Sequence, residues 1–160
     1  MSRKFITHLW KSIIFENNNF IVLNKWDGIA TQGGSKINYS INDIIKSISQ
    51  DYNLVHRLDI ETSGLLMISK NLKTTKLLGL LFREKKIEKK YIAICQGIPK
   101  NKNSIIKKKI TIQSNKQKIS LTKTAYQVLF KNKKLSIILF TPFTGKKHQL
   151  RIVAKKIGCP

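Results

Sequence analysis

The chain has 160 residues, 41% of them hydrophobic, which is long and apolar enough for one domain with a buried core. Its 31 lysine and arginine residues, against 8 aspartate and glutamate residues, give a net charge of +23. No apolar run approaches the roughly 20 residues of a membrane-spanning helix, so we expect no membrane partner. A cationic surface of this size attracts phosphate backbones or anionic membranes, and of these two we expect a nucleic-acid partner.

The positive charge is distributed unevenly along the chain. Residues 1–70 carry 8 basic and 6 acidic residues, a net charge of +2, whereas residues 71–160 carry 23 and 2, a net charge of +21. An AT-rich coding sequence would also favour lysine, and we assign part of the excess to that bias. A uniform bias would not divide the two halves so sharply, so the asymmetry predicts a nucleic-acid face.

The first 15 residues, MSRKFITHLWKSIIF, are basic and contain no acid. His8 and Lys11 interrupt their apolar stretch, unlike the continuous core of a secretory signal peptide. A mitochondrial transit peptide stays open, because such peptides are also basic and poor in acids. We expect a cytoplasmic bacterial protein, with a mitochondrial or plastid location as the alternative.

The cysteines and histidines lack the spacing of a metal site. Cys95 and Cys159 form no C-x-x-C pair, and His8, His56 and His148 are equally isolated. We therefore expect reduced thiols and no metal.

Hydrophobic spacing and turn residues predict alternating short elements. In the first half we expect a strand pair in 12–25, with its second strand at Phe20–Asn24, and then a Gly-punctuated loop at 26–35. A helix should follow an N-cap at Ser40, with its apolar side at Ile41, Ile44, Ile45 and Ile48. A buried strand at Leu65–Ser69 should precede a second helix, which runs from the cap Asn71 to Phe82 with its apolar side at Leu77, Leu78, Leu80, Leu81 and Phe82. In the second half we expect a strand in 87–97, a basic hairpin in 105–123, a second hairpin in 124–142 and a short helix in 146–158. Because hairpins dominate, the pattern favours an α+β domain with a mixed, largely antiparallel sheet and flanking helices.

The stretch VHRLDIETSGLLMIS, residues 55–69, contains an unusual acid. A loop aspartate is most often a solvated turn residue, but Asp59 lies two residues from Arg57, between apolar segments that anchor the loop to a core. A carboxylate held beside a cation stays ionised and can act as a nucleophile. Glu61 is the other carboxylate nearby, and its neighbours mark it as a turn residue.

A second cluster lies in TPFTGKKHQLRIVAKKIGCP, residues 141–160. After a Thr-Gly turn, Lys146, Lys147, His148 and Arg151 crowd the start of the expected helix, where backbone N–H groups also favour anions. Two interpretations stay open here: a solvated basic turn, or a clamp for phosphate or carboxylate.

Residues 55–69 closely resemble the H-R-L-D-x-x-T-S-G signature of the RluA/RluC family of ribosomal pseudouridine synthases. Three other segments resemble family motifs in the same order, and the resemblance runs from about Ile13 to Pro160. Residues 20–35 are similar to the N-K-P-x-G segment, with an ending closest to RluC, which acts on large-subunit rRNA. Residues 81–97 are similar to the segment with the family's tyrosine, and residues 141–160 to P-x-T-G-R-x-H-Q-L-R-x-H…G-H-P.

The resemblance implies a role for each matching residue. Asp59 matches the aspartate on which the reaction depends, and Tyr91 the tyrosine that packs against the target base and is placed to move a proton. Arg151 matches the arginine that pairs with the carboxylate, and Arg57 the arginine linked to displacing the target nucleotide. The resemblance further implies that Leu58, Thr62, Ser63 and Gly64 shape the loop.

Some positions depart from the family pattern. Lys146 replaces an arginine, so phosphate contact by Lys146, Lys147 and His148 is expected without a bidentate guanidinium. Trp26 replaces a proline, while Val153 and Cys159 replace histidines.

The implied protein has the pseudouridine synthase fold, with a basic active-site cleft and residues 1–160 forming the catalytic domain. It would turn uridine into pseudouridine in RNA, most directly 23S rRNA of the large subunit, as a monomer without a cofactor. Asp59 would either attack C1′ or stabilise and deprotonate the sugar, and both mechanisms stay open. The base would be flipped out of its stack for the reaction.

The family pattern also extends beyond both ends of this chain, with an N-terminal RNA-binding module and further motifs after G-H-P. We therefore expect a C-terminally truncated family member. Two other classes stay open: a catalytically inactive RNA-binding remnant, and an unrelated basic assembly factor with chance motif matches.

Overall fold

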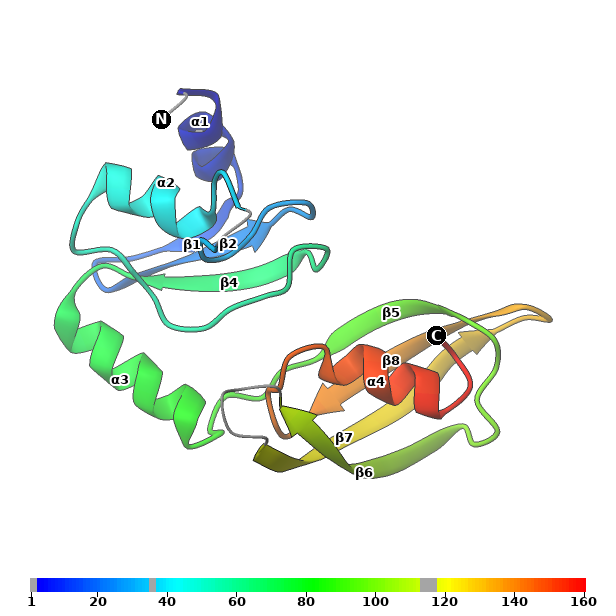
Figure 1. The fold of residues 1–160 in the computed structure, drawn as a ribbon. Helices are drawn as coiled ribbons and strands as arrows, with labels where there is room; N and C mark the ends of the chain where they lie inside the picture. The colour runs from blue at the N-terminus through cyan, green and yellow to red at the C-terminus, as the bar shows by residue number, and fades with distance from the viewer. Residues whose placement is uncertain (1–2, 35–36, 113–117) are drawn as a thin grey trace. The chain divides into compact units, whose positions relative to one another are not determined.

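The computed structural model describes residues 3–34, 37–112 and 118–160, which form two compact units, Met1–Lys86 and Ile87–Pro160. Each unit contains a four-stranded antiparallel sheet (Figure 1). The elements in chain order are α1 (Arg3–Lys11), β1 (Ile13–Glu16), β2 (Phe20–Lys25), α2 (Ile41–Ile48), β3 (Asn53–Leu54), β4 (Gly64–Ser69), α3 (Leu72–Arg83), β5 (Tyr91–Gln96), β6 (Asn103–Ile112), β7 (Lys118–Lys131), β8 (Leu135–Pro142) and α4 (Gln149–Lys156). The predicted α+β class is confirmed, with the strands divided between two sheets rather than joined in one.

The first unit has the strand order β1-β2-β4-β3. The register pairs Ile21 with Ile68 and Leu23 with Leu66, so these four fully buried side chains share one face of the sheet. The same face continues to Lys25, which lies opposite Gly64 at the end of the strands. Helix α2 covers this sheet and contributes three buried isoleucines, Ile41, Ile44 and Ile45 (Figure 1).

The caps predicted for two helices are confirmed. The Ser40 hydroxyl accepts a hydrogen bond from the Asp43 amide, and the Asp43 carboxylate accepts one from the Ser40 amide. This reciprocal capping box fixes the start of α2. At α3 the Asn71 side chain accepts from the Thr74 amide.

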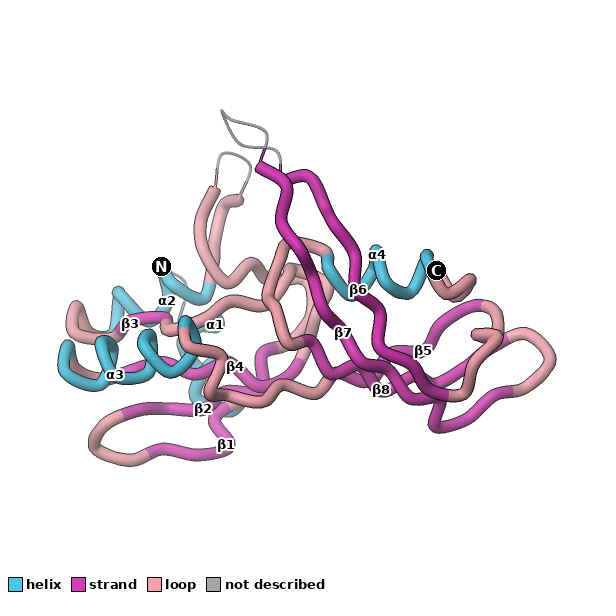
Figure 2. Tube along the Cα trace, turned by 90° about the horizontal axis from the view of Figure 1, so that it is seen from below, coloured by secondary structure: helices cyan, strands magenta, loops and turns pink. Residues whose placement is uncertain are grey.

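The second unit has the strand order β5-β8-β7-β6, with α4 packed on one face. Figure 2 shows the long β6–β7 ribbon, which confirms the predicted basic hairpin; residues 113–117, between the two strands, lie outside the described residues. The buried core between sheet and helix consists of Cys95, Tyr126, Val128, Ile138, Phe140, Val153, Ala154 and Cys159. Gly97 (φ +94°) lies so close to the Gly158 carbonyl that a Cβ atom would clash with it, which lets the chain after α4 close against the end of β5.

Both cysteines are buried free thiols in this core. Burial raises the pKa of each thiol, and the other cysteine's charge adds to the rise for Cys95. A thiol held in its neutral form is a poor nucleophile, so these residues act as small apolar core groups.

Three expectations about elements were wrong or incomplete. Residues 3–11, considered only as a targeting signal, form the amphipathic helix α1, whose Leu9 is buried. In β4 Leu65 is 62% exposed, because alternate residues of a strand face opposite sides. In α3 Leu77 is 56% exposed and Leu78 is buried, so the apolar side is narrower than the leucine run suggests. Among the described residues, no helix is both long and apolar enough to span a membrane.

Candidate active site

The loop that carries Asp59 connects β3 to β4 in the first unit. Leu58 is buried, Asp59 is half-buried and Arg57 is exposed, so the apolar residue anchors the loop while the charged residues approach the surface. The Thr62 amide donates to the Asp59 carbonyl and closes a turn directly after the carboxylate. Gly64 has φ +117°, a conformation that glycine favours, and the chain enters β4 there.

A buried lysine of β2 holds this loop through hydrogen bonds to backbone carbonyls. The Nζ of Lys25, which is fully buried, donates to the carbonyls of Trp26 (2.8 Å), Ile29 (2.9 Å) and Ile60 (3.2 Å). Because Ile60 follows Asp59 directly, the ammonium ties the acid-bearing loop to the loop that follows β2. An ammonium has three donors, and here all three are used.

The charge of Lys25 is also part of the site. Burial lowers the pKa of its ammonium, and this lowering is opposed by the carboxylates of Asp27, Asp59 and Glu61. The Asp59 carboxylate therefore lies in the field of a buried cation in its own unit.

Thr31 provides a second fixed point. Its buried hydroxyl donates to the Leu58 carbonyl (2.7 Å) and accepts from the Leu58 amide (3.1 Å). The Gly28 amide adds a bond to the Ile60 carbonyl (3.0 Å). Backbone groups on both sides of Asp59 are thus held by residues 25–31, and we call this set of contacts the loop clamp.

His56 holds the entry to the loop. Its Nε2 accepts a hydrogen bond from the Met67 amide of β4 (3.0 Å). The ring also stacks on Phe82 of α3, with centroids 4.5 Å apart. His56 therefore connects the Asp59 loop to β4 and α3, a structural role that was not anticipated from the sequence.

In the second unit one buried amide organises the basic turn, residues 143–148. Gln149 accepts at Oε1 from the Thr144 hydroxyl (2.9 Å) and the Lys146 amide (3.1 Å). Its Nε2 donates to the Thr124 hydroxyl of β7 (2.9 Å). The turn is thereby attached to the sheet through a side chain that is 4% exposed.

The basic side chains of this turn and of α4 are mostly exposed. Lys147 and His148 are exposed, Lys146 is half-buried, and Arg151 is exposed on the first turn of α4. His148 occupies the N-cap position with φ 54° and makes no side-chain capping bond. The left-handed conformation is unfavourable for a residue with a Cβ atom, so the turn is bent at a cost in stability.

Tyr91 is the first residue of β5 and pairs with Phe140 of β8. It is half-buried and packs against the core cluster of the second unit. The strand pairing and this packing together restrict the position of the ring.

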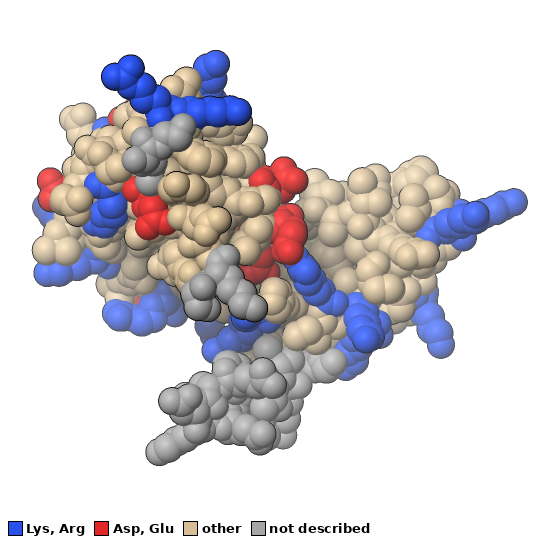
Figure 3. Space-filling view, turned by 45° about the horizontal axis from the view of Figure 1, so that its top comes forward, with Lys and Arg blue, Asp and Glu red and all other residues tan. Residues whose placement is uncertain are grey.

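The structure thus places the predicted residues in two groups. Arg57 and Asp59 share one loop of the first unit, while Lys146, Lys147, His148 and Arg151 share the basic turn and α4 of the second, with Tyr91 on β5. Basic side chains are spread over the surface seen in Figure 3, whereas acidic ones occur in a few places. Within the described ranges no group of three or more histidine, cysteine or acidic side chains could hold a metal ion.

Sequence reasoning missed the residues that support the site, namely Lys25, Thr31 and Gln149. A signal existed for Lys25, because it continues the buried alternation of Ile21 and Leu23 along β2. A lysine at an inward-facing strand position requires a set of acceptors.

The family model for RNA pseudouridylate synthase matches residues 19–156. A protein of Rickettsia bellii named ribosomal large subunit pseudouridine synthase C is 43% identical over 92% of this chain and 54% of its own length. A protein of the same name from Buchnera aphidicola subsp. Acyrthosiphon pisum is 34% identical over 96% of this chain and 53% of its own length. The chain spans about half the length of the curated relatives it matches.

Solved structures agree on the fold. The human RNA pseudouridylate synthase domain containing 4 superposes with a TM-score of 0.86 at 24% identity, covering 98% of this chain and 69% of that one. The human RNA pseudouridylate synthase domain containing 1 gives a TM-score of 0.76 at 22% identity, covering 93% and 66%. The motif matches are therefore not chance matches in an unrelated basic protein, and the chain belongs to the RluA family of RNA pseudouridine synthases.

Proposed function

We propose that this chain carries the catalytic part of an enzyme that converts uridine to pseudouridine in large-subunit ribosomal RNA. The observation that carries the proposal is the position of Asp59, a half-buried carboxylate in the family's signature loop, held on both sides by the loop clamp. The choice of RNA is supported by relatives that are named for the large ribosomal subunit.

The reaction needs few groups. The N1–C1′ bond of uridine breaks, the base turns, and a C5–C1′ bond forms; the proton at C5 is lost and N1 gains one. Oxidation state does not change, so no redox cofactor is required. The base must leave its stack before it can turn, which costs a few kcal/mol in RNA.

The chain's residues supply the remaining steps. The Asp59 carboxylate acts on the sugar, either by attack at C1′ or by stabilising and deprotonating it. By the family resemblance we also assign Arg151 and Tyr91 to the catalytic set, in which Tyr91 stacks on the base and moves a proton. Arg57, exposed on the same loop as Asp59, displaces the target nucleotide from its stack.

RNA is held by charge. Lys146, Lys147 and His148 contact phosphates, within a segment, residues 71–160, whose net charge is +21. Binding is accordingly salt-dependent, with a log–log slope of roughly −0.7 per phosphate neutralised on a single strand. We further propose a monomer in the bacterial cytoplasm, with residues 1–160 belonging to one catalytic domain.

The test is to incubate the purified chain with large-subunit rRNA and to map pseudouridine by chemical modification and primer extension. Asp59→Asn keeps the size of the side chain and should abolish the product. Asp51→Asn removes an exposed carboxylate of the same unit and should leave the yield unchanged. Product formation by the Asp59→Asn protein at a near wild-type rate would overturn the assignment.

A second candidate is an RNA-binding protein without activity, which the charge of residues 71–160 favours independently of the loop. It predicts tight, salt-sensitive binding of the same RNA and no pseudouridine with the wild-type chain. Measuring product and affinity on one preparation distinguishes the two functions.

A further inference from the structure

Helix α1 presents a basic stripe that the proposed chemistry does not use. Lys4, Thr7, His8 and Lys11 follow the i, i+3, i+4, i+7 spacing of one helix face, while Leu9 points into the core. The helix contains no acidic residue, and Arg3 adds a further cation at its start. Figure 3 shows basic side chains gathered at the α1 end of the first unit.

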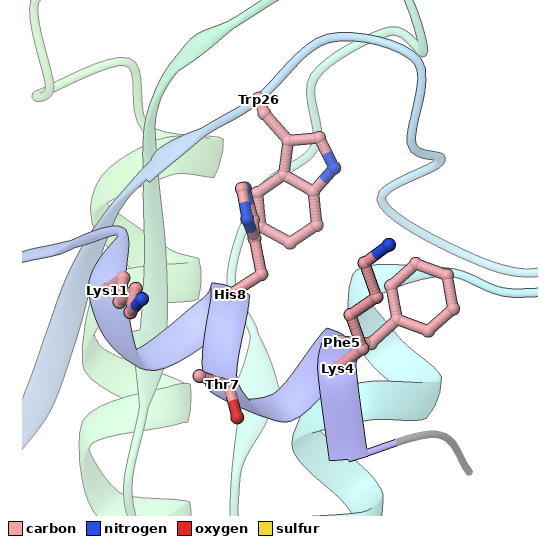
Figure 4. A pocket seen from close by; sticks show the side chains of 6 residues that line it. All are labelled: Lys4, Phe5, Thr7, His8, Lys11 and Trp26. Atoms are coloured by element: carbon pink, nitrogen blue, oxygen red, sulfur yellow. The ribbon is translucent and has the colours of Figure 1, made fainter.

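This stripe forms one wall of an open hollow. Trp26, at the start of the loop after β2, forms the opposite wall, and Phe5 closes one end (Figure 4). The volume is about 400 Å³, within the range of sites for small groups, roughly 300–1,000 Å³. The hollow therefore combines aromatic surface with cationic ends.

The aromatic groups are held in place by contacts. The His8 imidazole meets the Trp26 indole edge-on, with ring centroids 4.2 Å apart, and Figure 4 shows the two rings next to each other. The Phe5 ring packs against the Tyr39 ring, with centroids 5.5 Å apart. Fixed aromatic faces between lysines are the arrangement with which proteins bind single-stranded nucleic acid, by stacking on bases and neutralising phosphates.

The hollow and the candidate active site share one anchor within the first unit, the buried Lys25 ammonium. The Trp26 carbonyl accepts from Lys25 Nζ, and the same ammonium donates to the Ile60 carbonyl beside Asp59. The loop that carries Trp26 is thus attached directly to the loop that carries Asp59. Asp27 follows Trp26 and is the nearest acid in sequence; it interacts electrostatically with Lys25.

We propose that the hollow between α1 and Trp26 binds single-stranded RNA that flanks the target uridine. A base stacks on Trp26, and the adjoining phosphates are neutralised by Lys4 and Lys11. This inference rests on the proposed function in taking RNA as the ligand, but it does not depend on turnover.

The two tryptophans of the chain, Trp10 and Trp26, allow a direct test. In the Trp10→Phe protein all tryptophan emission comes from Trp26, and a short unstructured single-stranded RNA should quench it. In the Trp26→Phe protein the emission of Trp10, which is 42% exposed, should change little. Unchanged Trp26 emission at saturating RNA would overturn the proposal.

A charge variant provides an independent readout that keeps Trp26 intact. Lys4→Gln combined with Lys11→Gln should weaken RNA binding about fivefold or more and reduce the salt slope by roughly 0.7 per lost phosphate contact. The matched control, Lys73→Gln with Lys76→Gln, removes two exposed lysines from α3 and should have a smaller effect. Equal losses of RNA affinity in the two double variants would mean that the lysines bind RNA only through the overall charge, and would contradict a site at α1.

Other outcomes are also decisive. If anionic phosphatidylglycerol vesicles shift Trp26 emission and RNA does not, α1 is a membrane-binding helix and the proposal is wrong. If RNA quenches Trp26 but wild-type protein makes no pseudouridine, the proposed function fails and the RNA site stands. If the protein forms pseudouridine but RNA does not quench Trp26, the proposed function stands and the RNA site at α1 is wrong.

Discussion

The Asp59 loop and the basic turn differ in how they are held. The Asp59 loop accepts one hydrogen bond from the Lys25 ammonium, at the Ile60 carbonyl, and two hydrogen bonds join the Thr31 hydroxyl to the backbone of Leu58. The basic turn depends on one buried amide, that of Gln149, and includes a left-handed residue, His148. The Asp59 loop is therefore held firmly around one half-buried acid, whereas the basic turn is held by fewer contacts and has exposed basic side chains.

This difference corresponds to the tasks assigned to the two regions. A group that acts on a bond must be placed within a fraction of an ångström, which requires a surrounding shell that locks it. Phosphate contacts tolerate variation in distance, because a flexible ammonium acts as a point charge. The predictions below alter the support of one region while leaving the other intact.

We expect the largest effect from Lys25→Met, which keeps the volume and removes all three donors of the ammonium. Loss of charge-assisted bonds to buried carbonyls should lower the free energy of unfolding by about 2–4 kcal/mol. Pseudouridine formation should fall further than RNA affinity, since the loop clamp belongs to the Asp59 loop. Denaturant melts, a single-turnover assay and RNA titration measure the three quantities.

The control for Lys25 is Lys86→Met. The Lys86 side chain is 65% exposed and pairs with Glu84 at the surface, so its loss should change stability by less than about 0.5 kcal/mol. Similar costs for both substitutions would show that the buried ammonium does not stabilise the loop.

Gln149→Leu should have an intermediate effect, restricted to the second unit. The Thr124 and Thr144 hydroxyls and the Lys146 amide lose a buried partner, which should cost about 1–3 kcal/mol. The basic turn loses its anchor, so RNA affinity should fall while the rate at saturating RNA is retained. Gln127→Leu, an exposed change on β7, is the matched control, and equal affinities of the two variants would contradict the anchoring role.

His148→Gly should give the smallest effect, and one of opposite sign. Glycine adopts φ 54° without strain, so stability should rise by about 0.5–1 kcal/mol, while RNA binding weakens through loss of one contact. Lys147→Gly, where φ is not positive, should destabilise the protein instead. Thermal melts and RNA titration of both variants test the prediction, and a lower melting temperature for His148→Gly would contradict it.

The sequence was most informative where local rules determine structure. Helix caps at Ser40 and Asn71, the hairpins and the position of Asp59 in a loop before a strand all follow from neighbouring residues. The loop clamp could not be predicted in this way, because Thr31 and Leu58 are joined by tertiary contact over 27 positions. Exposure was also misjudged at Leu65 and Leu77, since a leucine run does not reveal which face has a partner.

The most direct test compares Asp59→Asn with a Lys146→Gln, Lys147→Gln double variant on the same rRNA. Pseudouridine formed at saturating RNA and the RNA dissociation constant are measured on each preparation. Asp59→Asn should abolish the product with affinity within about twofold of wild type, while the lysine variant should bind several-fold more weakly and still form product. Product from Asp59→Asn at a near wild-type rate would contradict the account, because the clamped loop would then be only a structural turn.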